Sequence, residues 1–118
     1  MDPTHSLKLY RLLRTLSVAV EELGPNLPPR QLMALMLIAR ANAAGDPIGV
    51  RDIDMHLGDL KSGSASKLLR TMMHVEGERK AGVANTVRAE RDPKDLRKWD
   101  LVLTPKGEEI VNKILQHL

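Results

Sequence analysis

The feature that most constrains the fold is a change in the spacing of apolar residues along the chain. Up to about Gly77 they recur every three or four positions, which is the period of an amphipathic helix. From Val83 to Leu103 they alternate with other residues, which is the period of a strand. After Thr104-Pro105 the helical period returns. The sequence therefore predicts a mainly α domain with a small β-hairpin (α+β) just before its last helix.

Glycine and proline clusters set the expected boundaries of these elements. Helices are expected from about residue 4 or 6 to 23 and over about 30–43, 50–57 and 62–74, with a bridging strand at most over 48–50. A last helix is expected to begin at Pro105, with Thr104 as its N-cap. The hairpin strands are expected over 83–89 and 99–103, around a charged turn at 91–95. Two short helices, a tight turn and a hairpin predict a winged helix-turn-helix.

Composition excludes several classes of function. The chain has 118 residues, the size of one domain, and it has no cysteine. A disulfide framework, a thiol nucleophile and a cysteine-based metal site are therefore excluded. The sequence has no nucleotide-binding glycine loop, no HExxH and no GxSxG, and its four histidines show no metal-ligand spacing. We expect no enzyme, no cofactor and no metal. Without a signal-peptide pattern or an apolar run of about 20 residues, we expect a cytoplasmic protein with no membrane partner.

Charge is distributed unevenly. Residues 61–98 carry a formal net charge of +5, and the rest of the chain carries −2. A basic segment on a slightly acidic body is typical of a nucleic-acid-binding face. Charge alone also fits an ordinary solvated surface.

Two motifs carry a family resemblance. One pattern has Asp, one residue, Arg, an apolar strand ending in Leu-Thr, two residues and Gly, and it is met in register by Asp95, Arg97, Leu101, Leu103, Thr104 and Gly107. A second pattern, shared by many helix-turn-helix proteins, is met by Leu60, Ser62, Ser64, Ser66, Lys67 and Leu68. Over about residues 30–115 the sequence resembles the MarR family of bacterial DNA-binding regulators. The resemblance implies that Arg97 enters a DNA minor groove and that the Asp95 carboxylate orients its guanidinium.

The candidate DNA contacts lie on the fourth helix and on the hairpin, or wing. Small side chains let a helix N-terminus approach DNA closely, where free N–H groups and the helix dipole favour phosphate. The candidates on the recognition helix are Lys61, Ser62, Ser64, Ser66, Lys67 and Arg70, and those on the wing are Arg88, Arg91, Lys94, Asp95, Arg97 and Lys98. The alternatives are that the Ser/Gly run is only a cap and loop, and that Asp95 and Arg97 form a surface ion pair. Trp99 is expected to anchor the wing against the body.

The terminal helices carry apolar stripes that one subunit has no evident means to cover. The stripes consist of Leu9, Leu12, Leu13 and Leu16 in the first helix and Ile110, Ile114, Leu115 and Leu118 in the last. They predict a homodimer interface. The sequence departs from the family in being shorter after the wing and longer between Gly77 and Asp95. MarR proteins often bind an aromatic effector in a crevice, but nothing in this sequence identifies such a pocket, so a small-molecule or protein effector stays open.

Together these inferences predict a single winged-helix domain over residues 1–118. Dimerisation helices are expected at 1–23 and 105–118, and a DNA-binding lobe at 30–104 with its wing at 82–104. The predicted function is sequence-specific binding of double-stranded DNA by a homodimeric transcriptional regulator, a repressor on a pseudo-palindromic operator. The alternative is a winged-helix interaction module or accessory factor that binds a polymerase or another regulator. The operator and the regulated genes cannot be read from the sequence.

Overall fold

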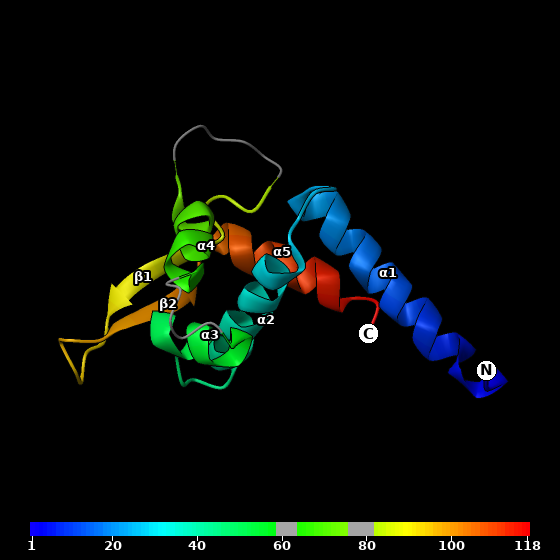
Figure 1. Ribbon diagram of the computed structural model, residues 1–118, viewed down its shortest axis with the longest axis horizontal. Helices are drawn as coiled ribbons and strands as arrows, with labels where there is room; N and C mark the ends of the chain where they lie inside the picture. The colour runs from blue at the N-terminus through cyan, green and yellow to red at the C-terminus, as the bar shows by residue number, and fades with distance from the viewer. Residues whose placement is uncertain (59–63, 76–81) are drawn as a thin grey trace.

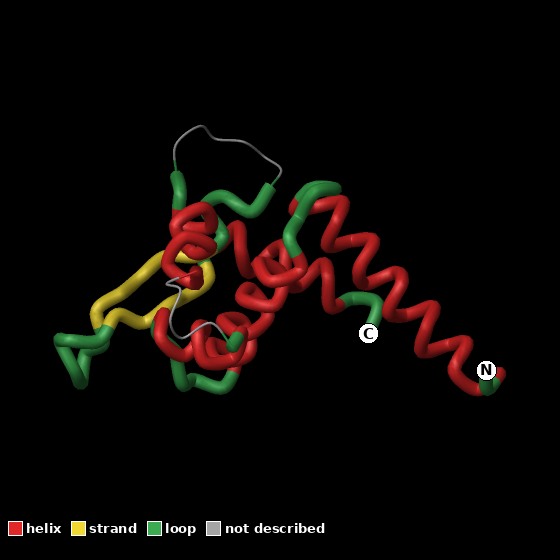
Figure 2. Tube along the Cα trace, viewed as in Figure 1, coloured by secondary structure: helices red, strands yellow, loops and turns green. Residues whose placement is uncertain are grey.

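The computed structural model describes residues 1–58, 64–75 and 82–118. A short 3₁₀ turn, η1, leads into the first of five helices, and a two-stranded hairpin comes before the last (Figures 1 and 2). The elements are η1 (Pro3–His5), α1 (Ser6–Leu23), α2 (Pro29–Ala43), α3 (Val50–Leu57), α4 (Ser64–Met73), β1 (Val87–Arg91), β2 (Trp99–Leu103) and α5 (Pro105–Leu115). The mainly helical α+β class and the predicted helices are confirmed to within a residue or two.

The hairpin begins later than its sequence pattern predicts. β1 and β2 pair antiparallel, with Val87 opposite Leu103 and Arg91 opposite Trp99. Residues 83–86 form turns instead of a strand, because Asn85 has a positive φ of 59° and the Thr86 hydroxyl donates a hydrogen bond to the carbonyl of residue 83 at 2.7 Å. The expected strand over 83–89 is therefore wrong in its first half. The backbone around Ile48 meets the hairpin through a hydrogen bond from the Leu101 N–H to the Ile48 carbonyl at 2.9 Å.

The core lies between α2 and the elements around it. Leu35 and Ile38 on α2 are fully buried, as are Leu69 on α4 and Leu101 on β2. Leucine, isoleucine, valine and methionine make up this core together with alanine. Helix α2 is thus the central helix on which both the helix-turn-helix and the hairpin rest.

A single asparagine attaches the hairpin to α2. The Asn42 Nδ2 donates to the Leu101 carbonyl at 3.0 Å, and its Oδ1 accepts the Leu103 N–H at 2.9 Å. One side-chain amide thereby satisfies two backbone groups on the free side of β2. This contact fixes where the wing leaves the body.

The start of α5 explains the Leu-Thr-x-x-Gly part of the wing motif. The Thr104 hydroxyl accepts the Gly107 N–H at 3.1 Å, which confirms Thr104 as the N-cap. Gly107 lies against the backbone of Thr86, so closely that a Cβ built on it would be 2.1 Å from the Thr86 carbonyl oxygen. Thr104 and Gly107 therefore have structural roles: they dock α5 against the base of the hairpin.

Helix α1 leans on α5 only through its C-terminal part. Its buried residues are Thr15, Ala19 and Leu23, and the Lys113 Nζ lies 3.2 Å from a Glu22 carboxylate oxygen. Residues 1–14 are all exposed, and the N-terminal half of α1 runs away from the rest of the chain (Figure 1). In the parts of the chain that the structure describes, no helix is long and apolar enough to span a membrane.

Candidate nucleic-acid interface

The two helices of the helix-turn-helix are joined by a capping interaction. The Asp54 carboxylate on α3 accepts the Ala65 N–H in the first turn of α4, at 3.2 Å. Gly58 ends α3 in the left-handed conformation, with φ of 75°. The first N–H groups of a helix have no partner within it, so the Asp54 carboxylate both satisfies one of them and sets the angle between α3 and α4.

Helix α4 presents a polar face to solvent. Ala65, Leu69 and Met72 are buried on its inner side, while Ser66, Lys67 and Arg70 are exposed on the other. Thr71 is also exposed on this face. The sequence analysis does not name it as a candidate DNA contact, although its position four residues after Lys67 indicates the same face. Of the other predicted contacts on this helix, Lys61, Ser62 and the Ser64 side chain lie outside the described residues.

The tip of the wing is held by two aspartates bonded to backbone amides. The Asp92 Oδ1 accepts the N–H groups of Lys94 and Asp95, at 2.7 and 3.0 Å. The Asp95 Oδ1 accepts the Arg97 N–H at 3.0 Å. Both are side-chain turns that fix a short irregular loop. They leave the side chains of Lys94 and Arg97 exposed at the tip.

The geometry differs from the expected contact between Asp95 and Arg97. The sequence predicts a carboxylate that orients the guanidinium, whereas the structure places the carboxylate on the Arg97 backbone amide. No ion pair between these two side chains occurs in the described part of the chain, and both are exposed. Asp95 therefore positions the backbone from which Arg97 projects and leaves the guanidinium open to solvent.

The remaining basic residues of the wing are engaged within the hairpin. The Arg88 guanidinium pairs with the Glu90 carboxylate at 2.7 Å. The Arg91 guanidinium lies 4.9 Å from the centre of the Trp99 ring, at stacking distance for a cation on an aromatic face. Trp99 is half exposed, so it does not anchor the wing against the body as its sequence position predicts; it packs across the hairpin instead.

Lys98 attaches the wing to the loop between α2 and α3. Its Nζ donates to the Pro47 carbonyl at 3.2 Å and lies 3.6 Å from the Asp100 Oδ1. Asp100 is only 6% exposed, and its Oδ1 has no hydrogen-bond partner among the described residues. Lys98 is thus a structural contact that offsets part of the charge on a buried carboxylate.

Asp92 and Asp100 have pKa values shifted in opposite directions. Burial raises the pKa of Asp100 above its ordinary value, and the adjacent Asp92 carboxylate adds to this increase. The backbone N–H groups of Lys94 and Asp95 lower the pKa of Asp92. Where the tip of the wing meets the strands, the Asp92 carboxyl group is therefore stabilised as the ion and the Asp100 carboxyl group is not.

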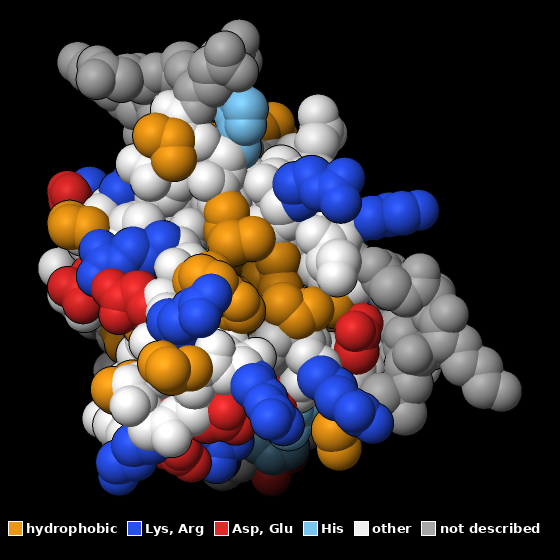
Figure 3. Space-filling view, turned by 90° about the vertical axis from the view of Figure 1, so that its left-hand side faces the viewer, with side chains coloured by type: hydrophobic (Ala, Val, Ile, Leu, Met, Phe, Trp, Pro, Cys, Tyr) orange, Lys and Arg blue, Asp and Glu red, His pale blue; other side chains and the backbone are white. Residues whose placement is uncertain are grey.

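These contacts divide the candidate residues into two groups. Lys67 and Arg70 on α4 and Lys94 and Arg97 at the wing tip are exposed and make no ion pair among the described residues. Arg88 and Arg91 are held by groups of the hairpin itself, and Lys98 is held by the Pro47 carbonyl and Asp100. Figure 3 shows the face formed by the wing, α3 and α4, with Lys and Arg side chains spread around a centre of apolar side chains.

The predicted interface residues also divide. Leu9, Leu12, Leu13 and Leu16 on α1 are exposed, as are Leu115 and Leu118 at the C-terminus. Ile110 and Ile114 are buried within the chain's own core, because α5 turns that side toward α1 and α2. The described ranges hold no group of three or more His, Asp or Glu placed to bind a metal ion.

The architecture places the protein in the winged helix-turn-helix class. A scan against protein-family models found no match, and neither did a search of the curated proteins. Among solved structures, MarR matches with a TM-score of 0.55 and 25% identity, over 98% of this chain and 75% of its own. A MarR-like transcriptional regulator from Thermotoga maritima matches with a TM-score of 0.58 and 24% identity, over 99% and 75%. The fold is the MarR-family winged helix.

Proposed function

We propose that this protein is a transcriptional regulator that binds double-stranded DNA in a sequence-specific way as a homodimer, and represses by occupying a pseudo-palindromic operator. The observation that carries the proposal is the pairing of an exposed polar and basic face on α4 with unpaired cations at the wing tip. A recognition helix reads base edges in the major groove, and a cationic wing suits an adjacent minor groove. The likeness to MarR, whose fold this chain shares, supports it.

In the proposed dimer, two copies of α4 enter successive major grooves roughly 34–36 Å apart. Lys67 and Arg70 contact phosphate or guanine, and Ser66 and Thr71 contact phosphate or base edges. The wing tip brings Arg97 to the minor groove, on a backbone fixed by Asp95. Lys94 adds attraction to phosphate, which weakens as salt rises.

The test compares two arginines of the same wing. The operator is first selected from random duplex DNA, and binding is then measured by fluorescence anisotropy at one fixed salt concentration. Arg97→Ala is expected to weaken binding about tenfold, in line with the loss of one direct contact. Arg88→Ala is the matched control, because the Glu90 carboxylate already holds that guanidinium, and it is expected to change affinity less than about twofold. Equal losses of affinity in the two variants would refute the proposal that the wing tip contacts DNA through Arg97.

A second candidate function is a protein-interaction module. Leu96 at the wing tip and the half-exposed Trp99 favour it, since large apolar side chains are enriched in protein interfaces. Regulators that bind DNA lose affinity steeply as salt rises and prefer one sequence over bulk competitor. An absence of duplex binding at low salt, with the chain folded by circular dichroism, would favour the interaction module.

A further inference from the structure

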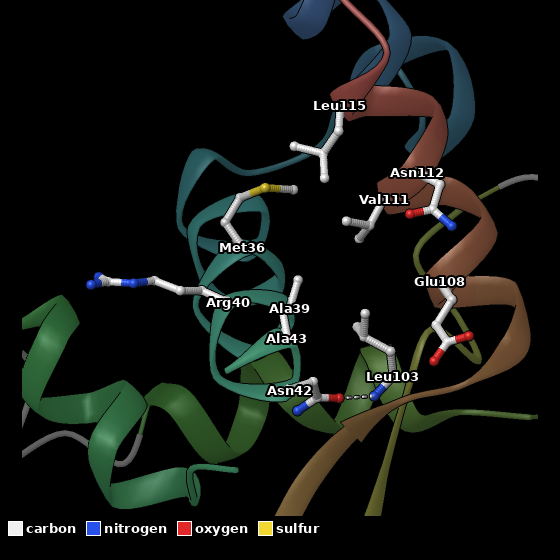
Figure 4. A pocket seen from close by; sticks show the side chains of 10 residues that line it. All are labelled: Met36, Ala39, Arg40, Asn42, Ala43, Leu103, Glu108, Val111, Asn112 and Leu115. Carbon is white, nitrogen blue, oxygen red and sulfur yellow. Dashed lines mark hydrogen bonds between the residues drawn. The ribbon is translucent and has the colours of Figure 1, made fainter. Parts of the chain in front are cut away.

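The edge of β2 that does not pair with β1 is fixed to the body at its inner end. The Asn42 side-chain amide binds the backbone of Leu101 and Leu103, and Figure 4 shows its bond to Leu103. The Ile48 carbonyl accepts the Leu101 N–H at 2.9 Å. From Leu101 the chain runs outward to Lys98 over about 10 Å, at the usual rise of an antiparallel strand. A two-stranded ribbon is only marginally stable by itself, so this outer part needs a contact of its own to keep one direction.

Lys98 supplies that contact, because it joins the wing tip to the body. Its backbone closes the tip: the Lys98 carbonyl accepts the Asp92 N–H, and the Lys98 N–H donates to the Asp95 carbonyl, both at 2.9 Å. Its side chain leaves the wing, and the Nζ donates to the Pro47 carbonyl at 3.2 Å, in the loop that leads into α3. One residue therefore closes the turn that carries Arg97 and holds that turn against the helix-turn-helix.

Asp100 keeps the Lys98 ammonium in this place. Asp100 is only 6% exposed, and its Oδ1 lies 3.6 Å from the Lys98 Nζ. A long lysine side chain loses rotamer freedom when it is fixed, and attraction to a carboxylate that is withdrawn from water offsets part of that cost. Lys94 offers the contrast, since it is exposed at the tip and forms no ion pair within the described ranges.

We propose that Lys98 is a positioning residue for DNA binding: it fixes the direction of the wing tip relative to the helix-turn-helix, and Asp100 retains it there. The inference rests on the proposed function and adds to it a residue that acts through Arg97 without touching DNA. A guanidinium enters a narrow minor groove from one direction only. Once Lys98 is released, the tip samples more directions, and Arg97 loses more conformational freedom when it binds.

The first measurement needs no DNA. The chain has no cysteine, so Leu96→Cys places a single nitroxide label on the tip, at a position that is 65% exposed. Electron paramagnetic resonance then reports the mobility of the tip. Lys98→Met is expected to increase this mobility, because it removes the bond to the Pro47 carbonyl. Lys94→Met is the matched control, since it removes the same charge from the same wing, and it is expected to leave the mobility unchanged.

A third variant separates positioning from general stability. Asp100→Asn is expected to increase the mobility of the label by less than Lys98→Met does. The same change is expected to raise Tm at pH 7, because it removes a charge that burial disfavours. A general loss of stability would instead raise the mobility and lower Tm together.

The second measurement is a double-mutant cycle on the selected duplex at one fixed salt concentration. Lys98→Met is expected to weaken binding about fivefold in the wild-type background and less than about twofold in the Arg97→Ala background, because it acts through that arginine. Lys94→Met is expected to weaken binding by the same factor in both backgrounds, since its own attraction to phosphate is lost.

The outcomes that would overturn the inference are distinct. Equal label mobility in the Lys98→Met and Lys94→Met chains would show that Lys98 does not fix the tip. Equal loss of affinity from Lys98→Met with and without Arg97 would make Lys98 a direct phosphate contact. An Asp100→Asn label no more mobile than that of the wild type would overturn the role assigned to Asp100. A wild-type chain that binds no duplex at low salt would refute the proposed function, and the label mobility would still decide whether Lys98 fixes the tip.

Discussion

Replacement of Gly107 by alanine tests the packing that holds the wing to α5. In a helix, Gly→Ala normally stabilises by about 1 kcal/mol, because glycine loses more backbone freedom on folding. Here the added Cβ would lie 2.1 Å from the Thr86 carbonyl oxygen and 3.0 Å from the Thr86 carbonyl carbon. Both atoms are backbone, so no side-chain rotation relieves the clash. The two segments must move apart by about 1 Å to restore ordinary contact.

That movement strains bonds on both sides of Thr86. Its carbonyl accepts the Thr104 N–H at 3.0 Å, and its own N–H donates to the Met72 carbonyl at 3.0 Å. Overpacking costs roughly 1–3 kcal/mol, and a weakened buried hydrogen bond costs about 1 kcal/mol more. After the gain in helix propensity is subtracted, we expect Gly107→Ala to lower the free energy of unfolding by about 1–3 kcal/mol. The expected fall in Tm is roughly 4–12 °C for a domain of this length.

The assay is thermal and urea unfolding followed by circular dichroism at a helix wavelength. Gly45→Ala is the matched control, because Gly45 has a φ of 71° and a Cβ there would meet nothing within 4 Å. That variant is expected to cost only the strain of the left-handed backbone, about 1 kcal/mol. If Gly107→Ala is as stable as the wild type or more stable, helix propensity outweighs packing at this position and the close approach to Thr86 is refuted.

Three further predictions concern side chains that hold the wing and the recognition helix. Asn42→Ala removes both hydrogen bonds to β2 and is expected to lower the free energy of unfolding in urea by about 2 kcal/mol. A loss below about 0.5 kcal/mol would show that Asn42 does not hold the hairpin on α2. Asp54→Ala removes the bond to the Ala65 N–H and is expected to cost about 1 kcal/mol and to weaken duplex binding, while Asp54→Asn should recover most of both. The pKa of Asp100 is raised in the folded protein, so ionisation of this carboxyl group opposes folding. Its contribution to stability therefore falls as the pH increases above 3.8, the ordinary pKa of an aspartate. Asp100→Asn is therefore expected to raise Tm at pH 7 and to lose that advantage below about pH 4; an equal effect at both pH values would show that charge is not the cause.

The sequence shows which residues of the wing are basic, but only some of their partners can be inferred from it. The pairing of Arg88 with Glu90 can be inferred from the sequence, because residues two apart on a strand share a face. The engagement of Lys98 with the Pro47 carbonyl was not, since it joins groups 51 positions apart. The basic segment found by counting charges is thus a mixture of exposed cations and cations used to build the hairpin. Only the tertiary structure distinguishes the exposed cations from the engaged ones, because formal charge carries no information on the partners of a side chain.

The apolar stripes show the same limit. In the sequence, Ile110 and Ile114 are indistinguishable from Leu9 and Leu12, since all four recur at helical spacing. In the fold, the isoleucines are buried inside the chain and the leucines are exposed. Which stripe is buried and which is exposed depends on the angle at which α1 packs against α5. No local sequence pattern encodes that angle.

By itself the sequence determined the order and the type of the elements. The helical and strand periods, the Thr104-Pro105 cap and the glycine and proline breaks are local, and local steric and hydrogen-bonding preferences act within a few residues. Tertiary structure alone decided how the hairpin is attached, through Asn42 and Gly107, and which apolar stripes are buried within the chain. Those contacts join residues far apart in sequence, so their positions are set by the packing of the whole domain.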